Sequence, residues 1–170
     1  MTGGRSWTNL INYLLFQGGW FAAPTLLVDW DGDGDGKVDM IVGTNNRCYL
    51  YRNVRAGAGS ALVVDDPEII KAAGADIQLS NPRFDLADID GDGDRELFGG
   101  CQPGPISMFE NIDASSPRKH PSFAAGRVIA FEDPYYIADA HSAVKVADFT
   151  GDGLPDYVVG RYWERTRVSH

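Results

Sequence analysis

Short apolar runs of four or five residues alternate with acidic, glycine-rich segments along this chain. Thr25–Val28 precedes one such segment, and Met40–Gly43 follows it. Apolar runs of this length, bounded by turn residues, are typical of β-strands rather than helices. The same order of strand, acidic loop and strand returns at residues 83–100 and 143–160. The pattern therefore predicts an all-β chain built from a repeated unit.

Further strands complete each unit. Rough alternation predicts a third strand at residues 48–54, and residues 106–112 match it, with Asn53 and Asn111 in equivalent places. Residues 7–16 fit a strand or a short helix, and the strand is favoured. Other predicted elements are a fourth strand that begins at residues 61–64, one helical turn at residues 68–73, a strand at residues 76–79 and an outer strand at residues 127–131. The third unit is expected to stop before its later strands form. Four short antiparallel strands in a unit of about 60 residues are typical of a β-propeller blade.

The acidic segments begin at Asp29, Asp88 and Asp148, which are 59 and 60 residues apart. In the second segment, carboxylates stand at positions 1, 3, 5 and 9, and glycine stands at positions 4 and 6. Hard cations such as Ca²⁺ take several oxygen ligands, and glycine permits the turn that wraps a loop around the ion. Carboxylates crowded in this way repel one another unless a cation lies between them. The spacing therefore predicts up to three Ca²⁺ sites.

Most of the negative charge of the chain lies in these three loops. The chain has 170 residues and a formal charge of −9, and thirteen of its 24 acidic residues lie in the three loops. Three Ca²⁺ ions would leave a charge of about −3. The acidity is therefore mainly that of cation sites, and it argues against a nucleic-acid partner, for which clustered Lys and Arg are expected.

Two cysteines, Cys48 and Cys101, exclude a disulfide-dense scaffold, and two free buried thiols are favoured over a bridge. No apolar run reaches the roughly 20 residues that span a membrane. The first residues carry no charged region followed by an apolar one, so no signal peptide is predicted. Because Ca²⁺ loops of this kind suit an extracellular setting, we expect that a leader has been removed or that the chain is part of a longer protein.

The loops and their flanks resemble FG-GAP/VCBS repeats. The resemblance is carried by Ala87–Gly93, by Ala147–Gly160, and by a glycine four residues after position 9 in each copy, at Gly43, Gly100 and Gly160. It covers roughly residues 22–165. It implies blades of an integrin α-like propeller, with one Ca²⁺ held between the first two strands of each blade.

The resemblance implies metal ligands at fixed positions of each loop. In the second loop they are Asp88, Asp90, Asp92, Glu96 and the Asp94 carbonyl. In the third they are Asp148, Thr150, Asp152, Asp156 and the Leu154 carbonyl. Thr150 replaces an aspartate, so the third site should bind more weakly. The first loop has two extra residues. We favour the register that uses Asp31, Asp33, Asp35, Asp39 and the Lys37 carbonyl, with Asp29 spare or in an outer shell.

The units are predicted as a leading strand segment at residues 1–21, repeat 1 at 22–80, repeat 2 at 81–140 and a partial repeat 3 at 141–170. A closed ring needs more blades than this. We therefore expect a partial propeller that belongs to a longer chain or is completed by copies of itself, because unclosed sheets leave faces and edges that favour association.

Other interpretations of the same residues are weaker. Asp31–Asp39 also fits the first nine positions of an EF-hand or dockerin-like loop, but position 12 is Val42 in a β-rich exit. Plain solvated turns do not need so many carboxylates. Trp30, after the first aspartate, could stack on a sugar, but this position, which Ile89 and Phe149 also hold, more often faces a core. His120 and His141 lack a ligand or catalytic partner at a suitable spacing, and no acidic pair is placed for catalysis.

The sequence thus favours a non-enzymatic, Ca²⁺-binding extracellular or cell-surface module that acts in adhesion, recognition or self-assembly. Its partners would be another protein, a glycan or copies of itself. The alternative is an accessory or partial domain of a secreted polysaccharide-processing enzyme, which rests on analogy of fold alone.

Overall fold

The fold is all-β, as predicted. The computed structural model describes residues 5–6, 24–30, 36–44, 46–57, 60, 63–101, 104–113, 121–129, 142–161 and 164–169, with residues 5–6, 161 and 164–169 described by their backbone alone. Every regular element within these ranges is a strand. The same ranges hold no helix that is long and apolar enough to cross a membrane.

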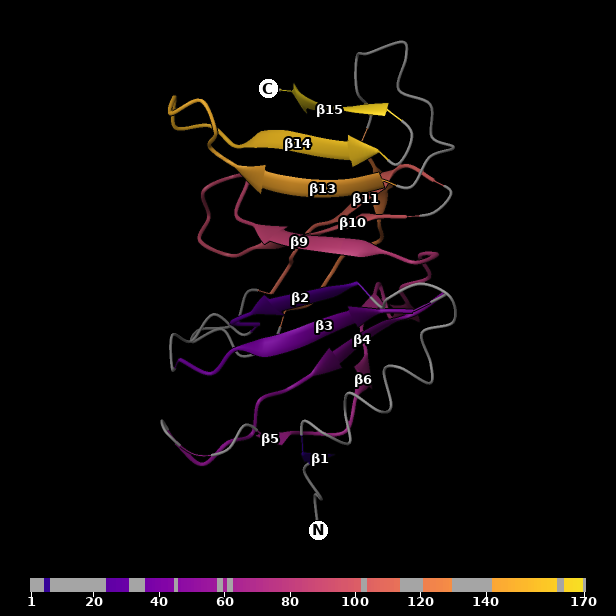
Figure 1. Ribbon diagram of the computed structural model, residues 1–170, viewed down its shortest axis with the longest axis vertical. Helices are drawn as coiled ribbons and strands as arrows, with labels where there is room; N and C mark the ends of the chain where they lie inside the picture. The colour runs from indigo at the N-terminus through magenta and orange to yellow at the C-terminus, as the bar shows by residue number, and fades with distance from the viewer. Residues whose placement is uncertain are drawn as a thin grey trace.

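Three larger antiparallel sheets follow one another along the longest axis of the molecule (Figure 1). The first sheet has the order β2 (Thr25–Val28), β3 (Asp39–Gly43), β4 (Cys48–Tyr51) and β6 (Glu68–Ile69). The second has the order β9 (Arg83–Ala87), β10 (Glu96–Gly100), β11 (Ile106–Phe109) and β12 (Arg127–Val128). The third has β13 (Ser142–Ala147), β14 (Asp156–Arg161) and β15 (Glu164–Ser169). Each sheet is thus an up-and-down meander that begins with the strand before an acidic loop.

The first two strands of each sheet pair in the same register. The residue before each loop pairs with position 9: Val28 with Asp39, Ala87 with Glu96, and Ala147 with Asp156. Ten residues separate the first pair, whereas eight separate each of the others. The first loop therefore carries its two extra residues between otherwise equivalent strands.

Each pair of consecutive sheets shares one apolar core. Between the first and second sheets lie Trp30, Ile41, Leu50, Ile70, Phe84, Leu97, Phe109 and Phe123, among others. Between the second and third lie Phe98, Ile106, Met108, Val144, Val146 and Val159. Because side chains alternate across a strand, Leu97 and Phe98 serve opposite cores. The repeat therefore buries its apolar surface against its neighbours rather than within itself.

Close backbone contacts and one buried carboxylate also join the sheets. The glycine that ends β3, Gly43, lies against Pro82, where a Cβ atom would be 2.6 Å from the carbonyl oxygen. Gly100, which ends β10, lies in the same way against the carbonyl of Ser142. Asp85 of β9 accepts hydrogen bonds from the Val146 amide and the Lys145 ammonium of β13, each at 2.8 Å.

The predicted helical turn at residues 68–73 is wrong. Glu68–Ile69 is the outer strand of the first sheet, and β7 (Lys71–Ala72) forms a hairpin with β8 (Ala75–Asp76). The two residues between β7 and β8, Ala73 and Gly74, both have positive φ, at 49° and 79°. That is the geometry of a tight hairpin turn. The isoleucines of this segment favour strands, and burial against the neighbouring sheet decides the outcome.

Other strand predictions need smaller corrections. The third unit was expected to stop early, yet it forms a third strand, β15, which pairs with β14. The segment at 61–64 is not an outer strand of the first sheet: β5 (Val63–Val64) pairs instead with β1 (Arg5–Ser6). The predicted leading strand at residues 7–16 lies outside the described residues.

Both cysteines are buried and neither forms a disulfide, as predicted. Burial raises the pKa of Cys48 to about 12 and also raises the pKa of Cys101. Burial therefore disfavours the thiolate form of both side chains.

Candidate metal centre

The second acidic loop brings three carboxylates together at the mouth of the β9–β10 hairpin. Ligand oxygens of Asp88, Asp90 and Glu96 all lie within 4.8 Å of one another. Asp88 follows β9 directly, and Glu96 is the first residue of β10. Among the described residues, this is the one group of three or more Asp, Glu, His or Cys side chains that is gathered so closely. The strands thus fix two of the three carboxylates.

Backbone amides hold the loop in shape. Asp88 accepts hydrogen bonds from the amides of Gly91 and Gly93 at 2.8 and 3.0 Å. Both glycines have positive φ, at 77° and 90°, which a side chain would resist. Glu96 accepts from the amide of Ile89 at 3.0 Å, so position 9 is tied back to position 2.

The third loop repeats this network position by position. Asp148 accepts from the amides of Gly151 and Gly153 at 2.6 and 2.9 Å, and both glycines again have positive φ. Asp156, at position 9, accepts from the amides of Phe149 and Thr150, each at 2.9 Å. The position 5 carboxylates, Asp92 and Asp152, each accept from the amide two residues later. Two loops with different side chains at positions 2, 3, 7, 8 and 9 thus adopt one conformation.

Position 9 is buried in both loops, although it carries a charge. Glu96 is 2% exposed and Asp156 is 1% exposed. Desolvation raises the pKa of Glu96, and the carboxylates of Asp90 and Asp94 raise it further, whereas the hydrogen bond from Ile89 opposes the shift. A buried carboxylate beside other carboxylates is costly without a cation. A cation placed among these carboxylates would offset that cost.

The geometry fits Ca²⁺. Ca²⁺ binds oxygens at about 2.3–2.6 Å, so two ligands of one ion lie no more than about 4.6–5.2 Å apart. The 4.8 Å limit met by the three carboxylates satisfies this condition. All three are hard oxygen donors, the type that Ca²⁺ prefers to nitrogen or sulfur. In the third loop Thr150 supplies only a hydroxyl at position 3.

Comparison with known proteins agrees with the repeated loops. The FG-GAP-like repeat matches residues 31–99 and again residues 88–159. Together these matches span well over half of the chain. The chain belongs to the FG-GAP-like repeat family. No curated protein and no solved structure gives a significant match.

The three meanders are consistent with propeller-type blades, the form associated with FG-GAP-like repeats. The first and second repeats supply four strands each and the third supplies three. The described sheets do not close on one another into a ring. The chain therefore presents an open row of FG-GAP-like units (Figure 1).

The first FG-GAP-like loop is described only at its two ends. Asp31, Asp33 and Asp35 lie outside the described residues. Gly36 has positive φ, 74°, and stands three residues before Asp39, as Gly93 stands before Glu96. The first family match also begins at Asp31, where the second begins at Asp88.

Several contacts of this FG-GAP-like loop were not predicted. The buried Asp39 carboxylate accepts a hydrogen bond from the Asn53 amide at 2.7 Å. Arg55 donates to the Gly36 carbonyl at 2.8 Å, and Arg95 of the second loop donates to the Asp29 carbonyl. The second loop is thereby tied to the first. No spacing in the sequence points to these arginines, because each contact depends on how the repeats stack.

Position 2 of the FG-GAP-like loop was predicted to face a core, and the outcome differs between repeats. Trp30 is 5% exposed and meets Phe123 edge to face, with 5.8 Å between ring centroids. Ile89 is partly buried and packs against the core between the second and third sheets. Phe149 is 53% exposed, so the prediction is wrong there.

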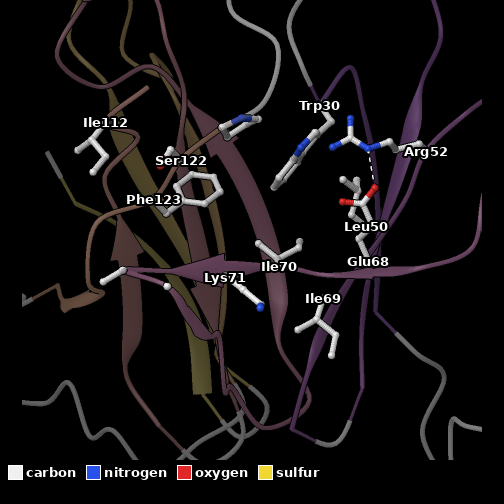
Figure 2. A pocket seen from close by; sticks show the side chains of 13 residues that line it. Trp30, Leu50, Arg52, Glu68, Ile69, Ile70, Lys71, Ile112, Ser122 and Phe123 are labelled. Carbon is white, nitrogen blue, oxygen red and sulfur yellow. Dashed lines mark hydrogen bonds and ion pairs between the residues drawn. The ribbon is translucent and has the colours of Figure 1, made fainter. Parts of the chain in front are cut away.

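Trp30 also lines a pocket of about 450 Å³ between the first sheet and residues 112 and 121–123 (Figure 2). Leu50 and Phe123 lie beside it, and Arg52 forms an ion pair with Glu68 at 3.0 Å on the same wall. Because so little of the indole is exposed, Trp30 serves the core between the FG-GAP-like repeats rather than a platform for stacking on a sugar.

Proposed function

We propose that this chain is a Ca²⁺-stabilised β-propeller-type module that acts outside the cell in adhesion, recognition or assembly, without enzymatic activity. The observation that carries the proposal is the shared network of the second and third loops, in which a buried carboxylate at position 9 closes a ring of acidic groups. Membership of the FG-GAP-like repeat family supports it, since such repeats are typical of extracellular, adhesion-type proteins.

The residues that would hold the ions follow from position in the loop. The second site would use Asp88, Asp90, Asp92, Glu96 and the Asp94 carbonyl, and the third would use Asp148, Thr150, Asp152, Asp156 and the Leu154 carbonyl. For the first site, the positive φ of Gly36 and the start of the family match favour Asp31, Asp33, Asp35, Asp39 and the Lys37 carbonyl, with Asp29 left outside.

A bound Ca²⁺ would neutralise the loop carboxylates, and oxygens next to both strands of the hairpin would coordinate it. Position 1 follows the first strand directly and position 9 begins the second, so one ion would clamp the two strands at their open end. The chain's own contribution is the amide network that already aims Asp88 and Asp148 into the loop. The role of the ion is therefore structural.

In this proposal the repeats predicted at residues 22–80, 81–140 and 141–170 act as blades. Each sheet begins at the strand before its loop, and each apolar core lies between consecutive sheets. That division of the core is what stacked blades require.

Isothermal titration with Ca²⁺, on metal-free protein, tests the proposal. We expect saturable binding with more than one site, and we expect Asp88→Ala and Asp148→Ala each to remove one of them. Lys71→Ala, at an exposed lysine on β7 away from the loops, is the matched control and should leave the stoichiometry unchanged. Binding that is unaffected by both aspartate substitutions would contradict the assignment of the loops.

A further inference from the structure

The first and second acidic loops begin at the same side of the molecule. β2 and β9 lie side by side and run in the same direction (Figure 1). Asp29 follows β2 directly, and Asp88 follows β9 directly. The strands therefore bring the start of the first loop close to the second loop.

Arg95 crosses the junction between these two repeats. It stands at position 8 of the second loop, and its guanidinium donates a hydrogen bond to the backbone carbonyl of Asp29. The acceptor is held on both sides, because Asp29 lies between β2 and Trp30, whose side chain is 5% exposed and belongs to the core between the first two sheets. The Arg95 side chain thus anchors the second loop to the first repeat.

Position 8 lies between two proposed ligands of the second Ca²⁺ site. Position 7, Asp94, would offer its backbone carbonyl, and position 9, Glu96, would offer its carboxylate. A restraint on the backbone of Arg95 therefore acts on both of its neighbours, although Arg95 is not itself a proposed ligand. Groups that orient the ligands of a metal commonly affect its affinity as strongly as this indirect role suggests.

The other two loops restrain the same segment by different means. The third loop has Pro155 at position 8, and its ring fixes φ at about −65°. In the first loop the equivalent residue is Val38, whose carbonyl accepts a hydrogen bond from the Asn53 carboxamide of the same repeat at 3.2 Å. Each loop thus has a restraint next to position 9, and the one that Arg95 gives to the second loop comes from the preceding repeat.

We propose that Arg95 is a positioning residue of the second Ca²⁺ site, and that the anchor on Asp29 makes the affinity of this site depend on the first repeat. The proposal rests on the proposed function, because it requires an ion in the second loop. The anchor acts by preorganisation: a segment that is already held loses less freedom when the ion binds, so binding is tighter.

The charge of Arg95 has the opposite effect on affinity. A guanidinium carried by the loop repels a bound cation, so the loss of its charge alone should tighten Ca²⁺ binding. The loss of the anchor should weaken binding. The direction of the change therefore separates the positioning role from a simple effect of charge.

Calorimetric titration with Ca²⁺, on variants that retain one site each, tests the proposal. Asp33→Ala combined with Asp148→Ala retains the second site, and adding Arg95→Met should lower its affinity by about tenfold, as is typical when a group that orients a ligand is lost. Asp33→Ala combined with Asp88→Ala retains the third site, which Arg95→Met should leave unchanged. An unchanged or tighter second site, or equal weakening of both sites, would overturn the proposal.

Arg95→Pro transfers the restraint of the third loop to the second. It removes the guanidinium, as Arg95→Met does, but it fixes the backbone at position 8, so it should recover most of the lost affinity. A proline variant that binds as weakly as the methionine variant would contradict the positioning role. If Arg95→Pro does not fold, Pro155→Ala supplies the reciprocal measurement: it should weaken the third site, and an unchanged affinity there would count against the proposal.

Arg47→Met is the matched control, because it removes the same charge from an exposed residue between β3 and β4. It should leave the affinity of the second site unchanged. The titrations also separate this inference from the proposed function. If Asp88→Ala removes no site, the proposed function fails and the inference fails with it. If Asp88→Ala removes a site that Arg95→Met does not weaken, the positioning role alone is wrong.

Discussion

Gly100 lies so close to the backbone carbonyl of Ser142 that a Cβ atom on residue 100 would overlap the carbonyl oxygen. The exit strand of the second sheet thereby touches the first strand of the third. Gly43 and Pro82 make the equivalent contact one repeat earlier. The glycine at this place is therefore required by close approach between repeats.

Gly100→Ala should destabilise the protein, because the obstructing atom is backbone and cannot rotate away. We expect a loss of about 1–3 kcal/mol in the free energy of unfolding, typical of overpacking. Gly160→Ala is the matched control: it has no described neighbour in the single chain and should change stability by no more than about 0.5 kcal/mol. Urea unfolding in Ca²⁺ at high dilution measures both. Equal losses for the two variants would show that the contact with Ser142 is not the cause.

Asp85→Ala should weaken the junction between the second and third sheets far more than Lys145→Ala. The Asp85 carboxylate accepts from the buried Val146 amide, which would lose its acceptor at a cost of about 1–3 kcal/mol. The Lys145 side chain is 59% exposed, so its truncation should cost about 0–1 kcal/mol. Urea unfolding of the two variants compares them directly. If the lysine variant loses more stability, the ion pair rather than the amide bond holds the junction.

Glu96→Gln should have opposite effects with and without Ca²⁺. The substitution keeps an oxygen for the Ile89 amide but removes a buried charge that lies beside Asp90 and Asp94. Without Ca²⁺ the variant should therefore melt at a higher temperature than the wild type at neutral pH. With Ca²⁺ it should gain less stability than the wild type, because a ligand has been neutralised. A variant less stable than the wild type in chelator would contradict the repulsive role given to Glu96.

The difference in stability between Glu96→Gln and the wild type in chelator should depend on pH. The pKa of Glu96 is raised above its ordinary value of 4.5, so the metal-free folded state holds the proton more tightly than the unfolded chain. The stabilising contribution of the protonated side chain is thus complete below 4.5 and is lost as the pH rises through the raised pKa. The advantage of Glu96→Gln in chelator should accordingly grow from acidic to neutral pH.

Thr150→Asp should strengthen the third site. It restores the carboxylate found at position 3 of the second loop, and Ca²⁺ affinity rises with the number of charged ligands. We expect an increase in affinity on the order of tenfold, measured by calorimetry in an Asp88→Ala background. In chelator the same variant should be slightly less stable, since another acidic group joins Asp148 and Asp152. An unchanged affinity would mean that position 3 does not contact the ion.

The strands beside the loops could be predicted because their sequences are constrained locally. Position 9 begins the exit strand in all three repeats, and the loop glycines that the structure describes take the expected positive φ. The predicted equivalence of Asn53 and Asn111 is confirmed, since each forms an isolated bridge and each carboxamide oxygen accepts from the amide two residues later. These features could be predicted because they recur at equivalent positions in the repeats.

Features that depend on stacking could not be predicted. The outer strand β6 is two residues long, too short to show a period, and it was mistaken for a helical turn. The 53% exposure of Phe149 depends on which sheets pack around its loop rather than on the loop sequence itself. The contact between Arg95 and the Asp29 carbonyl likewise joins residues that only the packing of repeats brings together.

Thermal unfolding in Ca²⁺ and in chelator, with Mg²⁺ as the control cation, tests the central claim most directly. If Ca²⁺ clamps the two strands beside each loop, the unfolding midpoint should rise markedly in Ca²⁺. Mg²⁺ should give a much smaller rise, because it demands a more compact octahedral site and dehydrates reluctantly. Equal midpoints in Ca²⁺ and in chelator would contradict the account.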